Sequence, residues 1–369
     1  DEAIVSANRW EQGKTEIPYR IEKINMSETQ FQNPQTAADL LGISGYAYIQ
    51  KSQLAGGSPM LRGFATNRVL LVVDGVRMNN AIFRLGNVQQ VISLDAGSTE
   101  SAEILFGPET VMYGSDAIGG VMDFHTLTPK FSENNKPFLT INAMGRYSTA
   151  SNEKTGHLDF NAGFRKWALV TSITYADYED LRAGSHGNKY FLRPYYQHTI
   201  NGHDTVIANK DPQVQVRSGF SQYYIMQKIS LRPSAAWNIN YAFHYSSTTD
   251  APRYDRLYLD SNDDGIFDNA EWYYGPQQWM MNRLEIKHAT GNWFYNQMRM
   301  VAAWQIFEES RHDRKFNNQR LRNQTEHINA YSANIDMDKE ISSKTKLFYG
   351  AEAVYNKVGS EANRININT

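Results

Sequence analysis

The sequence predicts two parts: an α+β domain at the N-terminus and, after it, strands of an antiparallel β-barrel that crosses a membrane. From about residue 136 onward, segments alternate apolar and polar side chains with a period of two. Aromatic residues stand at both ends of the apolar faces, and short connections alternate with long ones. A soluble sandwich would also give the alternation, but the other two features favour a membrane barrel.

The composition agrees with this class and excludes several others. The 369 residues carry a net charge of −2, so nothing indicates binding to nucleic acid. Mean hydropathy is −0.57, and no apolar run is long enough for a helical membrane span. A barrel remains compatible, because strands that alternate average out as hydrophilic. There are no cysteines, which excludes disulfides and thiolate zinc sites.

The first 132 residues predict short strands, one helix and tight turns. Residues 21–24 predict a strand, and a helix follows Asn33-Pro34 with Thr36 as its cap. Residues 69–73 predict a buried strand that ends in the turn Asp74-Gly75. Residues 56–59 predict a glycine-rich turn, not a phosphate loop, because no Lys-Ser or Lys-Thr pair follows. The helix body consists of Ala37, Ala38, Leu40 and Leu41.

The alternation in the second part can be counted. Trp237 and Tyr245 mark the ends of one apolar face, and Trp167 and Tyr175 mark the ends of another. Eight residues at about 3.4 Å each, tilted by about 40°, rise about 20 Å, which is close to the apolar band of a membrane barrel. The first face consists of Trp237, Ile239, Tyr241, Phe243 and Tyr245, opposite Asn238, Asn240, Ala242 and His244.

The connections predict an outer-membrane arrangement, with short turns on the periplasmic side and long loops outside. We count about nine strands, the last ending near Val358 before an open loop. Barrels with a filled lumen use about 22 strands, so we expect an incomplete record of a protein of about 700 residues. Short connections fall near residues 165–166, 232–234, 290–292 and 342–344, and long ones span 181–216, 250–276 and 310–322.

Four short motifs stand between residues 61 and 121. They are Leu61-Arg62-Gly63, Asp74-Gly75-Val76, Glu103-Ile104 with Gly107-Pro108, and Tyr113-Gly114-Ser115 leading to Ile118-Gly119-Gly120-Val121. In order and spacing this set resembles the plug domain of TonB-dependent outer-membrane receptors. The resemblance implies a plug at residues 8–132 inside a barrel whose N-terminal part is residues 136–369. It also implies a multi-pass β-barrel of the bacterial outer membrane that is a transporter, not an enzyme.

Residues 1–7 resemble the TonB box, the segment that a TonB-type energy-coupling protein captures. The physical requirement is a strand-prone peptide that adds to the edge of a partner's sheet through backbone hydrogen bonds. The alternative is an ordinary first strand of the plug. The resemblance assigns the TonB-box role to Glu2, Ala3, Ile4, Val5 and Ser6.

The resemblance also suggests where the plug meets the barrel and the ligand. A plug must face a polar lumen, so Arg62 and Glu103 are the candidates for contacts with the barrel wall. The alternative is that they form ion pairs within the plug. Ile82, Phe83 and Arg84 lie where the family's substrate-facing loop falls and are the candidates for ligand contact. The alternative there is a surface loop without a function.

Residues 251–258 and 271–279 resemble the third outer loop of the haem and haemoglobin receptors of this family. That branch commonly binds haem between a plug histidine and a loop histidine, but residues 79–90 contain no histidine. A ferric siderophore, bound by aromatic side chains and arginine, therefore remains an alternative to haem. The candidates for ligand binding in this loop are Arg253, Tyr254, Trp272 and Tyr273.

Residues 260–271 match the spacing of a calcium loop, with oxygen ligands at positions 1, 3, 5, 9 and 12 and glycine at position 6. Hard cations need several such oxygens converging on one point. The alternative is an acidic hairpin tip without metal. The candidate ligands are Asp260, Asn262, Asp264, Ile266, Asp268 and Glu271.

The predicted function is TonB-dependent active import of an iron complex, haem or a ferric siderophore, across the outer membrane. The predicted partners are a TonB-type protein, outer-membrane lipid and the iron-complex ligand, with a surface lipoprotein as a further candidate and no nucleic acid. No cofactor is required, and haem enters only as cargo. The alternatives are a surface binding or adhesion protein anchored by the barrel, a soluble two-domain β protein, and a receptor for cobalamin or an oligosaccharide.

Overall fold

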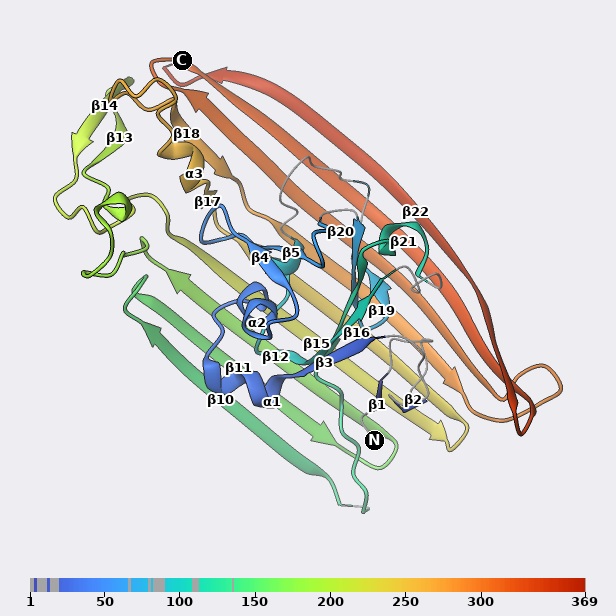
Figure 1. Cartoon of the computed structure of the whole chain (residues 1–369). Coiled ribbons are helices and arrows are strands. Elements are labelled where there is room, and N and C mark those ends of the chain that lie inside the picture. Colours follow the sequence, from blue (N-terminus) through green and yellow to red (C-terminus); the bar gives the residue numbers. More distant parts are fainter. Residues whose placement is uncertain are drawn as a thin grey trace.

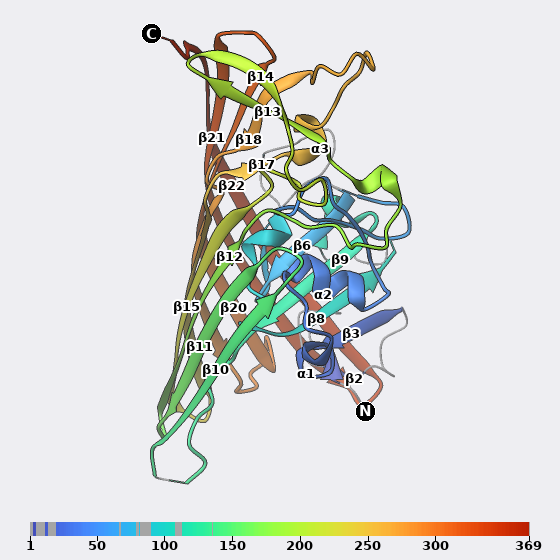
Figure 2. The ribbon, with the colours of Figure 1, turned by 90° about the vertical axis from the view of Figure 1, so that its left-hand side faces the viewer.

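The computed structural model describes residues 3–4, 12–13, 20–65, 68–78, 81, 90–107, 113–134 and 136–368. It contains one large curved sheet, called the wall here, and a small α+β domain formed by the described residues up to Thr126. The small domain lies on the concave face of the wall (Figure 1, Figure 2). Both parts of the predicted fold are therefore confirmed.

The wall is an antiparallel meander in which each long strand pairs with the next long strand along the chain. Within the part of the chain that the structure describes, nine strands have at least 11 residues, in agreement with the predicted number. They are β10 (Phe138–Ser148), β11 (Glu153–Gly163), β12 (Trp167–Tyr178), β15 (Phe220–Ser234), β16 (Trp237–Thr248), β19 (Gln278–His288), β20 (Gln297–Lys315), β21 (Arg320–Ser342) and β22 (Thr345–Asn366).

The apolar faces of these strands point away from the small domain. On β12, Trp167 and Tyr175 are exposed, whereas Ala168 and Ser172 are buried. β16 repeats this alternation from Tyr241, which is exposed, to Ser246, which is buried, whereas residues 238–240 are all half-buried. Successive side chains of a strand point to opposite faces, so one face of the wall meets the surroundings and the other meets the small domain. The predicted alternation is therefore confirmed on both strands.

Two long connections lie at the same end of the wall (Figure 2). Residues 179–219 contain η7 (Lys189–Phe191) and the hairpin of β13 (Tyr195–Ile200) and β14 (His203–Ala208). Residues 249–277 contain β17 (Ala251–Pro252), α3 (Tyr254–Leu257) and β18 (Asn269–Tyr274), and β18 pairs with the outer part of β20. None of the described helices has the length and apolar character needed to cross a membrane.

Two predictions about the last strands are wrong. The predicted long connection at residues 310–322 is mostly strand, because β20 continues to Lys315 and β21 begins at Arg320. The charged side chains there obscured the alternation, yet they pair across the strands, as Arg322 and Asp313 do at 2.7 Å. The predicted end near Val358 is also wrong, since β22 pairs with β21 as far as Asn366.

The small domain is built on a five-stranded sheet in the order β3-β8-β9-β6-β7, with β6 parallel to β9. The glycine-rich turn predicted at residues 56–59 is shorter, because Ser58 already begins β5. The elements are β1 (Ala3–Ile4), β2 (Gln12–Gly13), β3 (Ile21–Asn25), α1 (Met26–Thr29), η2 (Gln30–Gln32), α2 (Ala37–Ile43), β4 (Tyr48–Gln50), β5 (Ser58–Met60), β6 (Val69–Val73), β7 (Val76–Arg77), η4 (Gln90–Ser93), β8 (Thr99–Phe106), η6 (Ser115–Ala117) and β9 (Gly120–Thr126).

Helix α2 begins where the sequence predicts. The hydroxyl of Thr36 accepts a hydrogen bond from the backbone N–H of Asp39, and the Asp39 carboxylate accepts one from the backbone N–H of Thr36. This reciprocal capping satisfies two donors at the helix start. The buried face of α2 then packs against the rest of the domain through Ala37, Ala38, Leu40 and Leu41.

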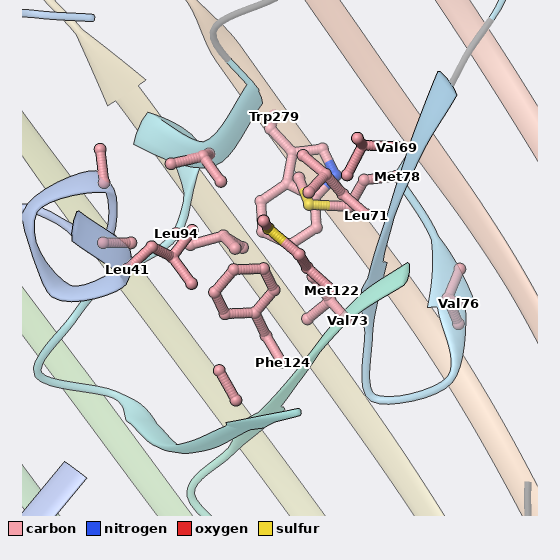
Figure 3. Packing of buried hydrophobic residues seen from close by; sticks show 14 of the residues in the cluster. Leu41, Val69, Leu71, Val73, Val76, Met78, Leu94, Met122, Phe124 and Trp279 are labelled. Carbon is pink, nitrogen blue, oxygen red and sulfur yellow. The ribbon is translucent and has the colours of Figure 1, made fainter. Parts of the chain in front are cut away.

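The small domain and the wall share one apolar core. Leu71, Met78 and Phe124 of the small domain pack with Trp279 of β19 (Figure 3). Apolar burial of this kind stabilises the contact by about 25 cal/mol per Å². The contact between the small domain and the wall is therefore partly apolar, whereas the sequence suggested a mainly charged contact. The other wall residues in the cluster are Met281, Val301, Ala303, Phe307, Ile328 and Ala330.

Candidate functional site

Asp74, in the turn between β6 and β7, joins the small domain to the wall. Its carboxylate lies 2.9 Å from Lys228 Nζ of β15 and 3.4 Å from His244 Nε2 of β16. It also accepts hydrogen bonds from the backbone N–H and the hydroxyl of Thr126, at 3.0 and 2.8 Å. Burial raises the pKa of this carboxyl, but Lys228 and His244 more than offset burial and hold the pKa well below its usual range.

The sequence predicted only a turn at this position. An Asp-Gly pair identifies the turn, and Asp74 adopts the left-handed backbone conformation that it requires, with a φ of 51°. Nothing local in the sequence identifies Lys228 and His244 as partners, because they come from distant strands. Asp74 is therefore the functional candidate that sequence reasoning missed.

A second group of charges lies on β19 and β20, beside the same turn. Arg299 Nε donates to Glu285 Oε1 at 2.6 Å, and Arg283 Nη2 lies 2.8 Å from the same oxygen. The guanidinium of Arg299 packs against Gly75, where a Cβ would come within 2.5 Å of Nη2. Glycine at position 75 therefore allows the turn to approach the wall closely.

Glu103 and His125 face each other on β8 and β9 of the small domain. Glu103 is fully buried, and its carboxylate lies 3.6 Å from His125 Nε2. Burial lowers the pKa of His125, but Asp123 and Glu103 reverse this effect and raise the pKa to about 9. Burial raises the pKa of Asp123 to about 6, against the attraction of His125. The predicted contact residue Glu103 therefore has a charged partner within its own domain.

A cavity of about 500 Å³ lies among these charged side chains and is lined by both the small domain and the wall. Asp74, Glu103 and His125 line it from the small domain, and Lys228 and Arg299 line it from the wall. The predicted contact residue Arg62 is elsewhere. It is exposed, and its guanidinium lies over the ring of Phe106, 5.0 Å from the centroid, within the small domain.

Another polar contact joins the small domain to β12 and β15. The hydroxyl of Thr174 donates to the Asp95 carboxylate at 2.8 Å. The carbonyl of Ile92 accepts hydrogen bonds from the Tyr224 hydroxyl at 2.9 Å and from Gln222 Nε2 at 2.7 Å. The small domain is thus held by hydrogen bonds on this side and mainly by apolar packing against β19 to β21 on the other. Arg77 adds polar contacts there: its carbonyl accepts from Gln305 Nε2 of β20, and its Nε donates to Glu352 of β22, both at 2.8 Å.

The predicted ligand residues of the outer loops divide into two groups. Arg253 lies over the ring of Trp272, 4.9 Å from the centroid, and Trp272 packs against a buried apolar cluster that contains Ala55 of the small domain. Tyr254 stacks on Tyr258 with ring centroids 6.1 Å apart. Arg253 and Trp272 are therefore together and near the small domain.

Tyr273 is separate from this group. Its ring stacks on His312 of β20, with centroids 4.6 Å apart, because side chains at successive positions of β18 alternate faces. Burial raises the pKa of Tyr273 to about 12. The structure does not bring all four predicted residues to one site.

A buried arginine forms hydrogen bonds with both long connections, residues 179–219 and residues 249–277. Arg314 of β20 is 1% exposed and donates to Asp204 of β14 at 2.7 and 2.8 Å and to Thr199 of β13 at 2.8 Å. Its Nε donates to Glu271 of β18 at 2.9 Å. Charge-assisted bonds to buried groups are among the stronger polar contacts in proteins. They therefore hold β13, β14 and β18 in one arrangement.

The predicted calcium loop is not assembled as a metal site. Among the described residues, no group of three or more His, Cys, Asp or Glu side chains converges as metal ligands. Asp260 accepts hydrogen bonds from the backbone N–H groups of Asp264 and Gly265, and Asp268 accepts one from that of Ser261. The carboxylates thus stabilise the turn itself, and Glu271 is directed to Arg314. Of the other candidates, Asn262 and Ile266 lie in the same turn and Asp264 accepts from the N–H of Ile266.

Two predicted groups fall largely outside the described residues. Of the TonB-box candidates Glu2, Ala3, Ile4, Val5 and Ser6, only the backbone of Ala3 and Ile4 is described, and it pairs antiparallel with Gln12 and Gly13. Ile82, Phe83 and Arg84 lie outside the described residues.

Residues 13–121 match the family described as the TonB-dependent receptor plug domain. Over 173 residues the chain is 32% identical to the vitamin B12 transporter BtuB of Vibrio vulnificus strain CMCP6, covering 46% of this chain and 27% of that protein. Over 128 residues it is 30% identical to the hemin receptor of Yersinia pestis, covering 34% of this chain and 18% of the receptor.

Solved structures share the fold. The copper transporter OprC aligns with a TM-score of 0.69 and 13% identity, over 94% of this chain and 48% of its own. The FrpB iron transporter of Neisseria meningitidis aligns with a TM-score of 0.67 and 15% identity, over 92% of this chain and 49% of its own. The chain spans about half the length of these two structures and less of the two sequence relatives.

Proposed function

We propose that this chain is part of a TonB-dependent receptor, a family of outer-membrane β-barrels that are not enzymes, and that it serves the active import of an iron complex. The cargo class is haem or a ferric siderophore. The observation that carries the proposal is the plug, the small domain, lying against the concave barrel wall and held there by the buried pair of Asp74 and Lys228. Cargo passes only when such contacts are broken by an energised partner.

The outer loops supply the place for cargo to bind. Trp272 lies under the Arg253 guanidinium and packs against the cluster that contains Ala55 of the plug, so we expect a ligand bound there to touch the loop and the plug together. A ligand changes the position of the plug only if it binds the two positions with different affinity. Contact with both parts gives that difference. Tyr254 is a further aromatic candidate in this loop, whereas Tyr273 stacks on His312 away from this group. Ile82, Phe83 and Arg84 remain the predicted plug contacts.

The N-terminal segment supplies the coupling. Ala3 and Ile4 already have strand conformation in their pairing with β2. A TonB-type protein that offers a sheet edge can replace that pairing with its own backbone hydrogen bonds. Glu2, Val5 and Ser6 complete the proposed TonB box, and a surface lipoprotein remains a predicted further partner.

The test is uptake by the full-length receptor carrying Ile4→Pro, with Ile4→Ala as the matched control. Proline removes a backbone donor and resists addition to a strand, whereas alanine keeps the donor. We expect Ile4→Pro to abolish energy-dependent uptake of labelled haem or siderophore while cargo binding at the cell surface stays normal. Normal uptake by Ile4→Pro, or uptake unaffected by an uncoupler, contradicts the proposal.

Cobalamin is a second candidate cargo, because the stretch of 173 residues is 32% identical to a vitamin B12 transporter. The absorbance spectrum of the receptor purified from its native membrane separates the candidates. A Soret band identifies haem, and corrin absorbance identifies cobalamin. Competition between labelled cargoes for surface binding then ranks the siderophores.

A further inference from the structure

The wall side of the plug–barrel cavity is rich in cations. Among the described residues that line the cavity from the wall, Glu285 is the single carboxylate. Three cations, Lys228, Arg283 and Arg299, are between 5% and 8% exposed. The wall cations that line the cavity are Lys228, Arg232, Arg283, Lys287 and Arg299.

The plug supplies the balancing negative charge. Asp74, Glu100, Glu103 and Asp123 line the cavity from the plug, together with Lys23 and His125. Asp74 pairs with Lys228 at 2.9 Å, and its backbone carbonyl lies 3.5 Å from Arg299 Nη2. Buried cations cost several kcal/mol unless they are paired. The resting plug therefore neutralises a surface that Glu285 alone does not balance.

Four buried side-chain atoms of the residues that line the cavity have no hydrogen-bond partner among the described contacts. They are Arg283 Nε and Asn238 Oδ1 on the wall and Asp123 Oδ1 and His125 Nε2 on the plug. Asp336 of β21 lies directly opposite Arg299 and attracts it from behind the cavity, without itself lining the cavity. The cavity is thus a polar surface of the kind that receives solvated or charged groups.

We propose that the five wall cations form a basic track, which the plug covers at rest and uncovers during transport, and that this track conducts anionic cargo. When the plug leaves, its carboxylates leave with it, and five cations face one carboxylate. A narrow passage lined by one sign of charge concentrates the opposite ion. The cargo class is accordingly an iron complex that carries carboxylate or other anionic groups. This inference rests on the proposed import function.

The absence of cysteine from the sequence allows a direct test by thiol labelling. Ser230 lines the cavity and is 3% exposed, so Ser230→Cys in the full-length receptor places one thiol on the track. Cells importing cargo are treated with an anionic sulfonatoethyl or a cationic trimethylammonioethyl methanethiosulfonate. The labelling rate with each reagent is divided by the labelling rate of Ser343→Cys, whose thiol lies in an exposed turn at the same end of the wall.

We expect labelling of Ser230→Cys only during energised uptake, with the normalised anionic rate about tenfold above the cationic rate. Adding Arg232→Gln and Lys287→Gln should lower that ratio several-fold. The control pair Arg165→Gln and Lys166→Gln removes the same charges from an exposed turn outside the cavity and should leave the ratio unchanged.

Other results overturn the basic track. Equal normalised rates during uptake show that the uncovered surface does not favour anions. Absence of labelling during measured uptake shows that the plug does not leave this surface. In both cases the uptake itself leaves the import function standing. Absence of energy-dependent uptake of any cargo rejects the import function, and the track with it.

Discussion

At the scale of single residues, Asp74 has two roles that few side chains could combine. It adopts the left-handed backbone conformation of the turn, and its carboxylate is shared by Lys228, His244 and Thr126. Glycine would suit the turn but would leave Lys228 buried without a counter-charge. Asp74 thus shapes the turn between β6 and β7 and also attaches the plug to the wall.

Asp74→Asn should weaken the attachment of the plug by about 3–5 kcal/mol, because it leaves a buried ammonium group without a carboxylate. The measurement is the urea concentration at which the plug loses protection from protease in the detergent-solubilised receptor. Asp263→Asn is the matched control, because Asp263 also has a positive φ of 56° but is exposed. An equal midpoint for both variants would show that the Lys228 pair contributes nothing.

His125 should make the plug less stable at alkaline pH. Its pKa is raised from 6.5 to about 9 by Asp123 and Glu103, so the protonated form stabilises the folded plug. The contribution is complete below pH 6.5 and is lost as the pH rises through about 9. The urea concentration at which the plug loses protection should therefore decrease from pH 6 to pH 8 and again to pH 10.

His125→Gln should remove most of that pH dependence, whereas His198→Gln, in an exposed outer loop, should not. A fall in the midpoint that is the same in the receptor and in His125→Gln would assign the effect to other groups.

At the scale of elements, the plug has unlike neighbours on its two sides. Strands β19, β20 and β21 offer it mainly apolar side chains such as Trp279. Strands β12 and β15 offer hydroxyl and amide groups such as Thr174 and Gln222, beside a smaller apolar cluster around Ala55. Water competes for hydrogen bonds and does not compete for apolar contacts. We therefore expect the hydrogen bonds to Thr174 and Gln222 to exchange with water before the apolar core around Trp279 opens when the plug is pulled.

Trp279→Ala should destabilise plug attachment by about 3–5 kcal/mol, because it leaves a cavity in the shared core. Trp304→Ala on the next strand is the matched control, since Trp304 lies on the outward face and is 39% exposed. Protease protection of the plug reports the first change, and retention of the folded barrel on unheated gels shows that the wall is intact. Equal loss of protection in both variants would show that the apolar core shared by the plug and the wall does not hold the plug in place.

The elements themselves were largely predictable from the sequence. Thr36 and the Ala-rich stretch after it specified α2, and alternation from Trp167 and Trp237 specified β12 and β16. The outer half of β20 was not predictable, because charged residues around Asp313 hide the period of two where the strand leaves the membrane. The pairing of Asp74 with Lys228 was not predictable either, since it depends on the tertiary arrangement of distant strands.

At the scale of the whole molecule, the wall is not of even height. β22 has 22 residues, and at about 3.3 Å per residue and a tilt of about 40° it rises about 55 Å. That is roughly twice the apolar band of a membrane barrel, about 25 Å. The pairing of β19 with β20 stops at Glu308, so the excess lies at the end that carries the long loops.

This uneven height decides what an approaching macromolecule encounters. The tight turn at residues 316–319 is carried on a paired ribbon of β20 and β21 far above the lipid headgroups. An antibody directed at this end of the wall would therefore meet a turn held between paired strands, and its epitope would be a hairpin with fixed backbone hydrogen bonds.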